Sequence, residues 1–138
     1  MPHENEIPPF DYDPIPDSLN LLARNVIAAA IEVHKELGPG HKEEAYEEAL
    51  ALEFEARGIP YQRQVWFDVV YKGQVVSRSR LDFLVGGELI VDVKSCDSLA
   101  ARDRAQAIGY LRCVQKRLAL FINFNCALLS TGIMRVIL

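Results

Sequence analysis

The sequence lacks long apolar runs, paired cysteines and recognisable phosphate-binding loops. It has no stretch of about eighteen apolar residues and no basic-then-apolar start, which argues against a transmembrane helix and a secretion signal. The three cysteines, Cys96, Cys113 and Cys126, form no CxxC pair, which argues against a disulfide framework and a four-cysteine metal site. Neither a glycine-rich phosphate loop nor a Ser-His-Asp arrangement is recognisable. We therefore expect a cytosolic protein with reduced thiols and no membrane partner.

Charge of the two signs is unevenly distributed along the 138 residues, whose net charge is -4. Residues 1–56 hold 3 basic and 13 acidic side chains, whereas residues 57–117 hold 11 basic and 6 acidic ones. A basic segment is compatible with a phosphate-binding surface. Scattered lysines and arginines are more simply interpreted as a solvated surface, so charge alone does not identify nucleic acid as the partner.

The spacing of apolar residues predicts an α/β protein. Five of the seven prolines fall in the first sixteen residues, so we expect a flexible tail over 1–16 and one domain over 17–138. Helical periodicity predicts helices over residues 18–37, 42–57 and 98–115. β-branched, aromatic and buried apolar runs predict strands over residues 61–71, 74–85, 88–96, 117–124 and 132–138.

Three charges interrupt the apolar runs around the Gly86-Gly87 turn in the stretch LDFLVGGELIVDVKS. Because side chains alternate along a strand, Asp92 and Lys94 should project from one face of their strand. Asp82 should share its face of the preceding strand with Arg78 and Arg80. The apolar residues expected on the opposite faces are Leu81, Phe83 and Val85 on the first strand and Leu89, Val91 and Val93 on the second.

A hairpin through the two glycines would bring Asp82 and Asp92 together, where two unpaired carboxylates would repel each other. Lys94 or a divalent metal ion would have to compensate the charge. A simple ion pair near the surface, with Lys94 or Arg80, is the structural alternative. Two carboxylates and the carbonyl of Val93 form an oxygen-only set that suits Mg²⁺ or Mn²⁺. Such a site suits metal-assisted cleavage of phosphodiesters.

The second helix carries one glutamate in line with its apolar row. Tyr46, Leu50 and Phe54 form that row, and Glu43 stands at its head. We therefore expect Glu43 to point along the packed side. The glutamates expected to be mostly solvated are Glu44, Glu47, Glu48 and Glu55.

Taken together, these segments resemble the PD-(D/E)XK nuclease superfamily and, within it, the bacterial GxxExxY proteins. The name motif of that branch is present as Gly40, Glu43 and Tyr46 in GHKEEAY. The segments IEVHKELGPG, RLDFLVGGELIVDVKS and LALFINFN are also similar to it, and the resemblance covers residues 18–138. It implies a restriction-endonuclease-like αβββαβ core, with a central mixed sheet flanked by helices.

The resemblance also implies roles for individual residues. It maps the first acidic metal ligand onto Asp82, the D/E-x-K motif onto Asp92 and Lys94, and the glutamate of the preceding helix onto Glu43. Gln106 and Tyr110 are similar to a pair that supports the site in exonuclease-like members, and their helical spacing places them on one face. In two departures from the motif, Leu81 replaces its proline and Asp92 its commoner glutamate.

Two functions follow as expectations from these residues and the resemblance. The first is a Mg²⁺- or Mn²⁺-dependent nuclease that acts on DNA or, as a second choice, RNA. Asp82, Asp92, Val93 and Glu43 would then hold or orient the metal, with Lys94, Gln106 and Tyr110 completing the catalytic site. The alternative is a catalytically silent module of the same fold that binds nucleic acid or a protein partner, with a homodimer as one candidate assembly.

Overall fold

The computed structural model describes residues 15–138, so residues 1–14 of the expected tail lie outside the described part. The elements occur in the predicted order. They are α1 (Asp17–Leu37), α2 (Glu43–Ala56), β1 (Tyr61–Tyr71), β2 (Gln74–Val85), β3 (Leu89–Lys94), α3 (Ala101–Val114), β4 (Leu118–Asn123), the 3₁₀ turn η2 (Leu129–Gly132) and β5 (Ile133–Ile137). The largest difference is at α3, which begins at Ala101 rather than near residue 98, because the Asp103 carboxylate accepts a hydrogen bond from the Ala100 N–H at 2.7 Å.

The five strands form one mixed sheet in the order β1-β2-β3-β4-β5. β1, β2 and β3 are antiparallel neighbours, and β4 and β5 also pair antiparallel. β3 and β4 pair parallel, with Asp92 opposite Phe121 and Lys94 opposite Asn123. A parallel pair needs a crossover connection, and α3 supplies it. β3 therefore lies in the middle of the sheet, where its charges have protein on both sides.

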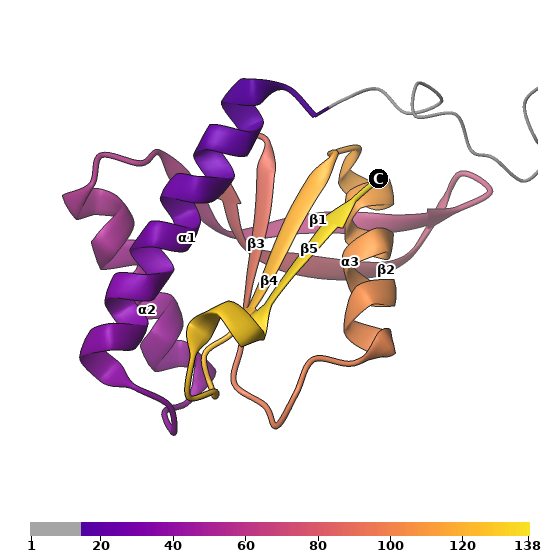
Figure 1. Cartoon of the computed structure of the whole chain (residues 1–138). Coiled ribbons are helices and arrows are strands. Elements are labelled where there is room, and N and C mark those ends of the chain that lie inside the picture. Colours follow the sequence, from indigo (N-terminus) through magenta and orange to yellow (C-terminus); the bar gives the residue numbers. More distant parts are fainter. Residues whose placement is uncertain (1–14) are drawn as a thin grey trace, which may run out of the picture.

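Helices cover both faces of the sheet (Figure 1): α1 and α2 pack on one face and α3 on the other. The larger apolar cluster joins α1 and α2 to Phe83, Val91 and Leu120, and the smaller one joins α3 to Ile90 and Phe121. Alternate residues of β3 and β4 thus enter opposite clusters, as their near-continuous apolar sequences require. This confirms the predicted mixed sheet flanked by helices.

The β2–β3 turn confirms the hairpin that the glycine pair predicts. Gly86 and Gly87 have φ angles of 59° and 71°, a left-handed conformation that few other residues adopt without strain. The Gly86 N–H donates to the carbonyl of Pro60 at 2.8 Å, and the Glu88 N–H donates to that of Val85 at 3.1 Å. The turn fixes the register in which Phe83 lies opposite Val91, which brings Asp82 and Asp92 close together.

Candidate functional site

The sheet is interrupted at the site where Asp82 enters it. Pairing between β1 and β2 keeps one register on both sides of Gln64 and Asp82, but these two residues are not themselves paired. Gln64 has a φ of 57°, outside strand geometry. Leu81 consequently packs in the α3 cluster and Phe83 in the α1–α2 cluster. The expectation that Leu81 shares a face with Phe83 and Val85 is therefore wrong, because simple alternation fails at this break.

The break places the two aspartates in direct contact. An oxygen of the Asp82 carboxylate accepts a hydrogen bond from the Val93 N–H at 2.8 Å, and Oδ1 of Asp92 lies 3.4 Å from the Asp82 backbone nitrogen. Asp82 thus closes the gap between β2 and β3 with its side chain instead of with ladder hydrogen bonds.

Lys94 supplies the positive charge on the same face. Its Nζ lies 3.4 Å from Oδ2 of Asp92 and donates to Oε1 of Gln106 at 3.0 Å. It also lies 5.4 Å from the centre of the Phe121 ring, within cation–π range. Tyr110 packs against that ring at 6.2 Å between centroids, on the α3 side of the sheet. The structure thus brings Gln106 into contact with Lys94 and holds Tyr110 in the adjoining apolar cluster.

Burial and neighbouring charges together raise the pKa values of all three charged groups. Only 4% of Asp92 is exposed, and this burial raises its pKa although Lys94 opposes the shift. Burial, followed by repulsion from Asp92, raises the pKa of Asp82 to about 7. Burial alone would lower the pKa of Lys94, but attraction to Asp92 and then Glu43 outweighs it, so the pKa is raised. Two carboxyl groups that resist ionisation beside a firmly charged lysine are typical of a functional cluster.

The oxygen donors of this cluster fit a hard divalent cation. The N–H of Val93 points toward Asp82, and in an extended strand the carbonyl of the same residue points to the same side. Asp82, Asp92 and this carbonyl then offer oxygen atoms only, and Mg²⁺ typically keeps several waters besides one or two carboxylates. Within residues 15–138, no group of three histidine, cysteine, aspartate or glutamate side chains is arranged to hold a metal. Glu43 is therefore not in direct ligand geometry with both aspartates.

The α2 glutamates lie differently from their predicted positions. Glu43 is exposed, because α2 begins at this residue and its first turn extends beyond the packed Tyr46. Glu47, expected to be solvated, has only 14% of its side chain exposed and accepts hydrogen bonds from Arg63 and Gln64, each at 2.7 Å. The expected packed orientation of Glu43 is wrong, and sequence reasoning missed Glu47 because its partners depend on the bend of β1.

Glu43 and Glu47 nevertheless border the same hollow as Asp82. This hollow, of about 610 Å³, lies between the start of α2 and the β1–β2 hairpin. Its lining residues are Glu43, Glu44, Glu47, Arg63, Gln64, Arg80 and Asp82. We call it the Asp82 hollow. It gives Asp82 an open approach from solvent.

Tyr46 fixes the loop that precedes Glu43. Its ring is buried and stacks on Phe124 with centroids 4.7 Å apart. Its hydroxyl donates to the Gly38 carbonyl at 2.5 Å and accepts from the His41 N–H at 3.1 Å. The His41 carbonyl in turn accepts from Ser95 Oγ at 2.6 Å. Tyr46 and His41 of the GHKEEAY segment, together with Gly38 before it, thus hold the start of α2 beside the end of β3.

Asn123 is a second buried polar residue that sequence reasoning missed. Its Oδ1 accepts from the backbone N–H groups of Cys96 and Asn125, both at 3.1 Å, and its Nδ2 donates to the Cys96 carbonyl at 3.0 Å. These bonds tie the segment after β3 to the segment after β4. An amide at the end of the otherwise apolar run LALFIN was the available signal.

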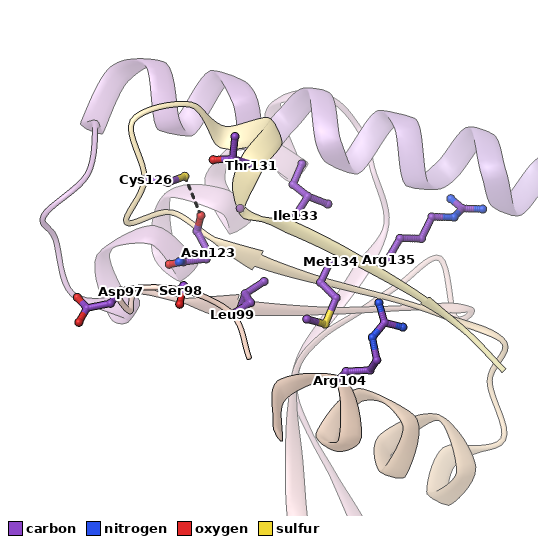
Figure 2. A pocket seen from close by; sticks show the side chains of 11 residues that line it. Asp97, Ser98, Leu99, Arg104, Asn123, Cys126, Thr131, Ile133, Met134 and Arg135 are labelled. Carbon is purple, nitrogen blue, oxygen red and sulfur yellow. Dashed lines mark hydrogen bonds between the residues drawn. The ribbon is translucent and has the colours of Figure 1, made fainter. Parts of the chain in front are cut away.

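Another hollow, of about 490 Å³, lies beside the start of α3 and the edge strand β5 (Figure 2). Arg104 and Arg135 reach toward it from α3 and β5, and Asn123 and Cys126 lie at its opposite end. Arg135 also donates to the Asn20 side chain at 2.5 Å. Asp97 is the one carboxylate among its lining residues. This hollow therefore lacks the group of carboxylates that lines the Asp82 hollow.

One of three comparisons with known proteins finds a match. In residues 15–138, no helix combines the length and apolar character needed to cross a membrane. Neither a curated protein nor a solved structure matches the chain. A family model described as the PD-(D/E)XK nuclease superfamily matches residues 20–136, which include the sheet and the aspartate–lysine cluster. With a match over most of its length, the chain belongs to the PD-(D/E)XK nuclease superfamily.

Proposed function

We propose that the chain is a divalent-metal-dependent nuclease that hydrolyses phosphodiester bonds in DNA. The observation that carries the proposal is the contact between Asp82 and Asp92, buried in mid-sheet beside Lys94. Buried like charges are costly unless a cation compensates them, and one lysine compensates only one carboxylate. A site that tolerates this excess of negative charge is suited to a metal ion.

Mg²⁺ or Mn²⁺ would be held by Asp82, Asp92 and the Val93 carbonyl. When bound, such an ion stabilises negative charge on a phosphate and lowers the pKa of a water molecule. Glu43 lies outside direct ligand geometry in the structure, so we assign it an electrostatic role. Its carboxylate helps to keep Lys94 protonated and orients water at the mouth of the site.

Lys94 acts as a charged hydrogen-bond donor in this proposal. Its pKa is raised, so it stays protonated and is not suited to act as a general base. The ammonium group of Lys94 has three N–H donors, and Asp92 and Gln106 occupy two of them. The third can orient the attacking water or the scissile phosphate. Gln106 positions Lys94, and Tyr110 supports that positioning through the α3 cluster.

Cleavage of labelled oligonucleotides tests the proposal. The full chain is incubated with single-stranded DNA, duplex DNA and RNA in Mg²⁺, Mn²⁺ or EDTA. Asp92→Asn keeps the shape of the side chain and should lower metal-dependent cleavage by about a hundredfold or more, because it removes a charged ligand. Glu36→Gln removes an exposed carboxylate on α1, away from the site, and as the matched control it should cleave like the wild type. Equal cleavage by both variants would remove the proposed mechanism.

The silent binding module is the second candidate function. The observation that favours it is the lack, within residues 15–138, of a third side-chain ligand beside the two aspartates. Calorimetry distinguishes the two functions, since a nuclease should bind Mg²⁺ or Mn²⁺ and lose that binding in Asp82→Asn. A wild-type chain that binds neither ion would support the silent module.

The finer parts of the proposal concern subfamily and context. The spacing of Gly40, Glu43 and Tyr46 supports the GxxExxY branch, and the hydrogen bonds of Tyr46 to Gly38 and His41 show that this tyrosine anchors the loop before α2. A homodimer and a cytosolic location also belong to the proposal. Sedimentation analysis and cell fractionation test these two parts.

A further inference from the structure

The β1–β2 hairpin extends well past α3 as a two-stranded ribbon (Figure 1). Toward its tip both strands are exposed, whereas β2 is half-buried or buried from Leu81 to Val85. Trp66 lies on this ribbon with 53% of its surface exposed, and it is the single tryptophan of the sequence. Exposing so large an aromatic side chain forgoes the stabilisation that its burial would give, so its position needs an explanation.

Two arginines surround the Trp66 ring. The guanidinium carbons of Arg78 and Arg80 lie 5.1 and 5.2 Å from the ring centre, and Arg80 is the direct cross-strand neighbour of Trp66. Arg78 lies 3.4 Å from Asp68 in an exposed pair, a weak interaction in water. Arg80 has no ion-pair partner among the described residues. We call Trp66, Arg78 and Arg80 the Trp66 platform.

The platform continues into the candidate active site. Arg80 belongs to the platform and also lines the Asp82 hollow. Arg78 and Arg80 are two positions apart on β2, a step of about 6.8 Å in a regular strand, and Asp82 follows two positions later at the break in the strand. A ligand lying along the platform is therefore led by neighbouring residues of one strand to Asp82.

We propose that the Trp66 platform binds a single-stranded segment of nucleic acid and leads it into the Asp82 hollow. Arginine and tryptophan side chains together recognise stacked bases and phosphates, and this cationic surface complements a polyanion. Base faces are accessible to an aromatic side chain only where bases are unstacked, which excludes the interior of an intact duplex. The inference rests on the proposed nuclease function and narrows its substrate to an end, flap or other single-stranded region.

Intrinsic fluorescence tests the proposal directly, because all tryptophan emission comes from Trp66. The full chain in EDTA is titrated with a short oligothymidylate, so that binding is observed without turnover. We expect quenching of the emission as a base stacks on the ring. Anisotropy of the labelled oligonucleotide should show binding weakened about tenfold or more in Trp66→Ala, and less in Trp66→Phe, which keeps a ring.

Charge variants complete the experiment. Arg80→Ala should weaken binding and reduce the slope of log affinity against log salt by about 0.7, the value for one phosphate contact on a single strand. Arg112→Ala removes an exposed arginine at the far end of α3 and should bind like the wild type.

Three results would overturn the inference. They are unchanged emission on binding, equal affinities for Trp66→Ala and Arg112→Ala, and emission that changes with protein concentration alone, which would make the platform a contact between copies of the chain. Tighter binding of blunt duplex DNA, with an affinity that Trp66→Ala does not change, would be a failure of the second kind. Absence of cleavage with every metal would refute the nuclease function separately, since this assay needs no turnover.

Discussion

β3 and the outer β1–β2 hairpin belong to the same sheet but treat charge in opposite ways. In β3, Asp92 is almost completely buried, and its charge is balanced by Lys94 at 3.4 Å. On the hairpin, Asp68 and Arg78 also lie 3.4 Å apart, but their side chains are 50% and 61% exposed. The same distance therefore corresponds to different interaction energies, because water screens the exposed pair and not the buried one.

The comparison distinguishes the candidate active site on β3 from the exposed surface of the hairpin. A buried charge persists in a fold only if neighbouring groups compensate it, so the Asp82–Asp92–Lys94 cluster is specified by its surroundings. The hairpin charges are solvated and need no compensating group in the protein, so they remain available to an external ligand. This contrast is why we assign chemistry to β3 and substrate contact to the hairpin.

The largest expected difference between the two regions is in the free energy of unfolding that is lost when each ion pair is broken. Lys94→Met leaves Asp92 buried without its cation, so we expect the free energy of unfolding to fall by about 3 kcal/mol. Arg78→Met breaks the exposed pair and should cost less than about 1 kcal/mol. Urea unfolding in EDTA at neutral pH measures both. Similar losses in the two variants would contradict the distinction between the two regions.

The pH dependence of stability should show a smaller effect at Asp82. Its pKa of about 7 in the folded state exceeds the ordinary value of 3.8, so folding favours the protonated form. The metal-free protein should therefore lose stability as the pH rises from about 4 to about 7. Asn cannot ionise, so Asp82→Asn should be more stable than wild type by about 1–2 kcal/mol near pH 8, after allowance for partial solvent screening, and equal near pH 4.

Thermal unfolding at the two pH values measures this effect. Asp68→Asn, on the exposed hairpin, should show no comparable gain. Added Mg²⁺ should raise the melting temperature of the wild type but not that of Asp82→Asn, because only the former keeps the ligand. A variant less stable than wild type at both pH values would show that Asp82 serves as a structural bridge instead.

Two tyrosines give the finest comparison. Tyr46→Phe removes a buried hydroxyl that donates to Gly38 and accepts from His41, so we expect a loss of about 1 kcal/mol. Tyr71 lies near the hairpin tip with 60% of its surface exposed, and Tyr71→Ser should change stability by less than about 0.5 kcal/mol. Urea unfolding measures both variants. A larger loss for Tyr71→Ser would show that the hairpin tip has structural contacts that its exposure does not suggest.

Much of the site could be predicted from sequence because it depends on local rules. Gly86-Gly87 fixes a tight turn, the turn fixes register, and alternation places Asp92 and Lys94 on one face. Helical spacing likewise places Gln106 and Tyr110 on one face of α3, whereas the contact of Gln106 with Lys94 depends on how α3 packs against the sheet. These relations involve a few consecutive residues or one turn. The structure therefore shows Asp82 close to Asp92, as the hairpin predicts, and the catalytic roles remain predictions.

Positions that depend on distant partners could not be predicted in this way. Glu43 and Glu47 are two glutamates of the same helix. Only the bend of β1 at Gln64 decides that Glu47, and not Glu43, accepts a hydrogen bond from the Gln64 side chain. Asn123 gives no local sign that it joins two loops. Leu81 obeys alternation in the sequence but not in the sheet, because the strand turns from one face to the other at Asp82.

The sequence by itself determined the order of helices and strands and the presence of two aspartates and a lysine around one hairpin, since periodicity and turn chemistry are local properties. Only the tertiary structure decided which carboxylates touch, which glutamate is held and where the tryptophan is displayed. Those outcomes depend on the burial of each group and on partners far away in the chain, and burial sets both the cost of a charge and its usefulness.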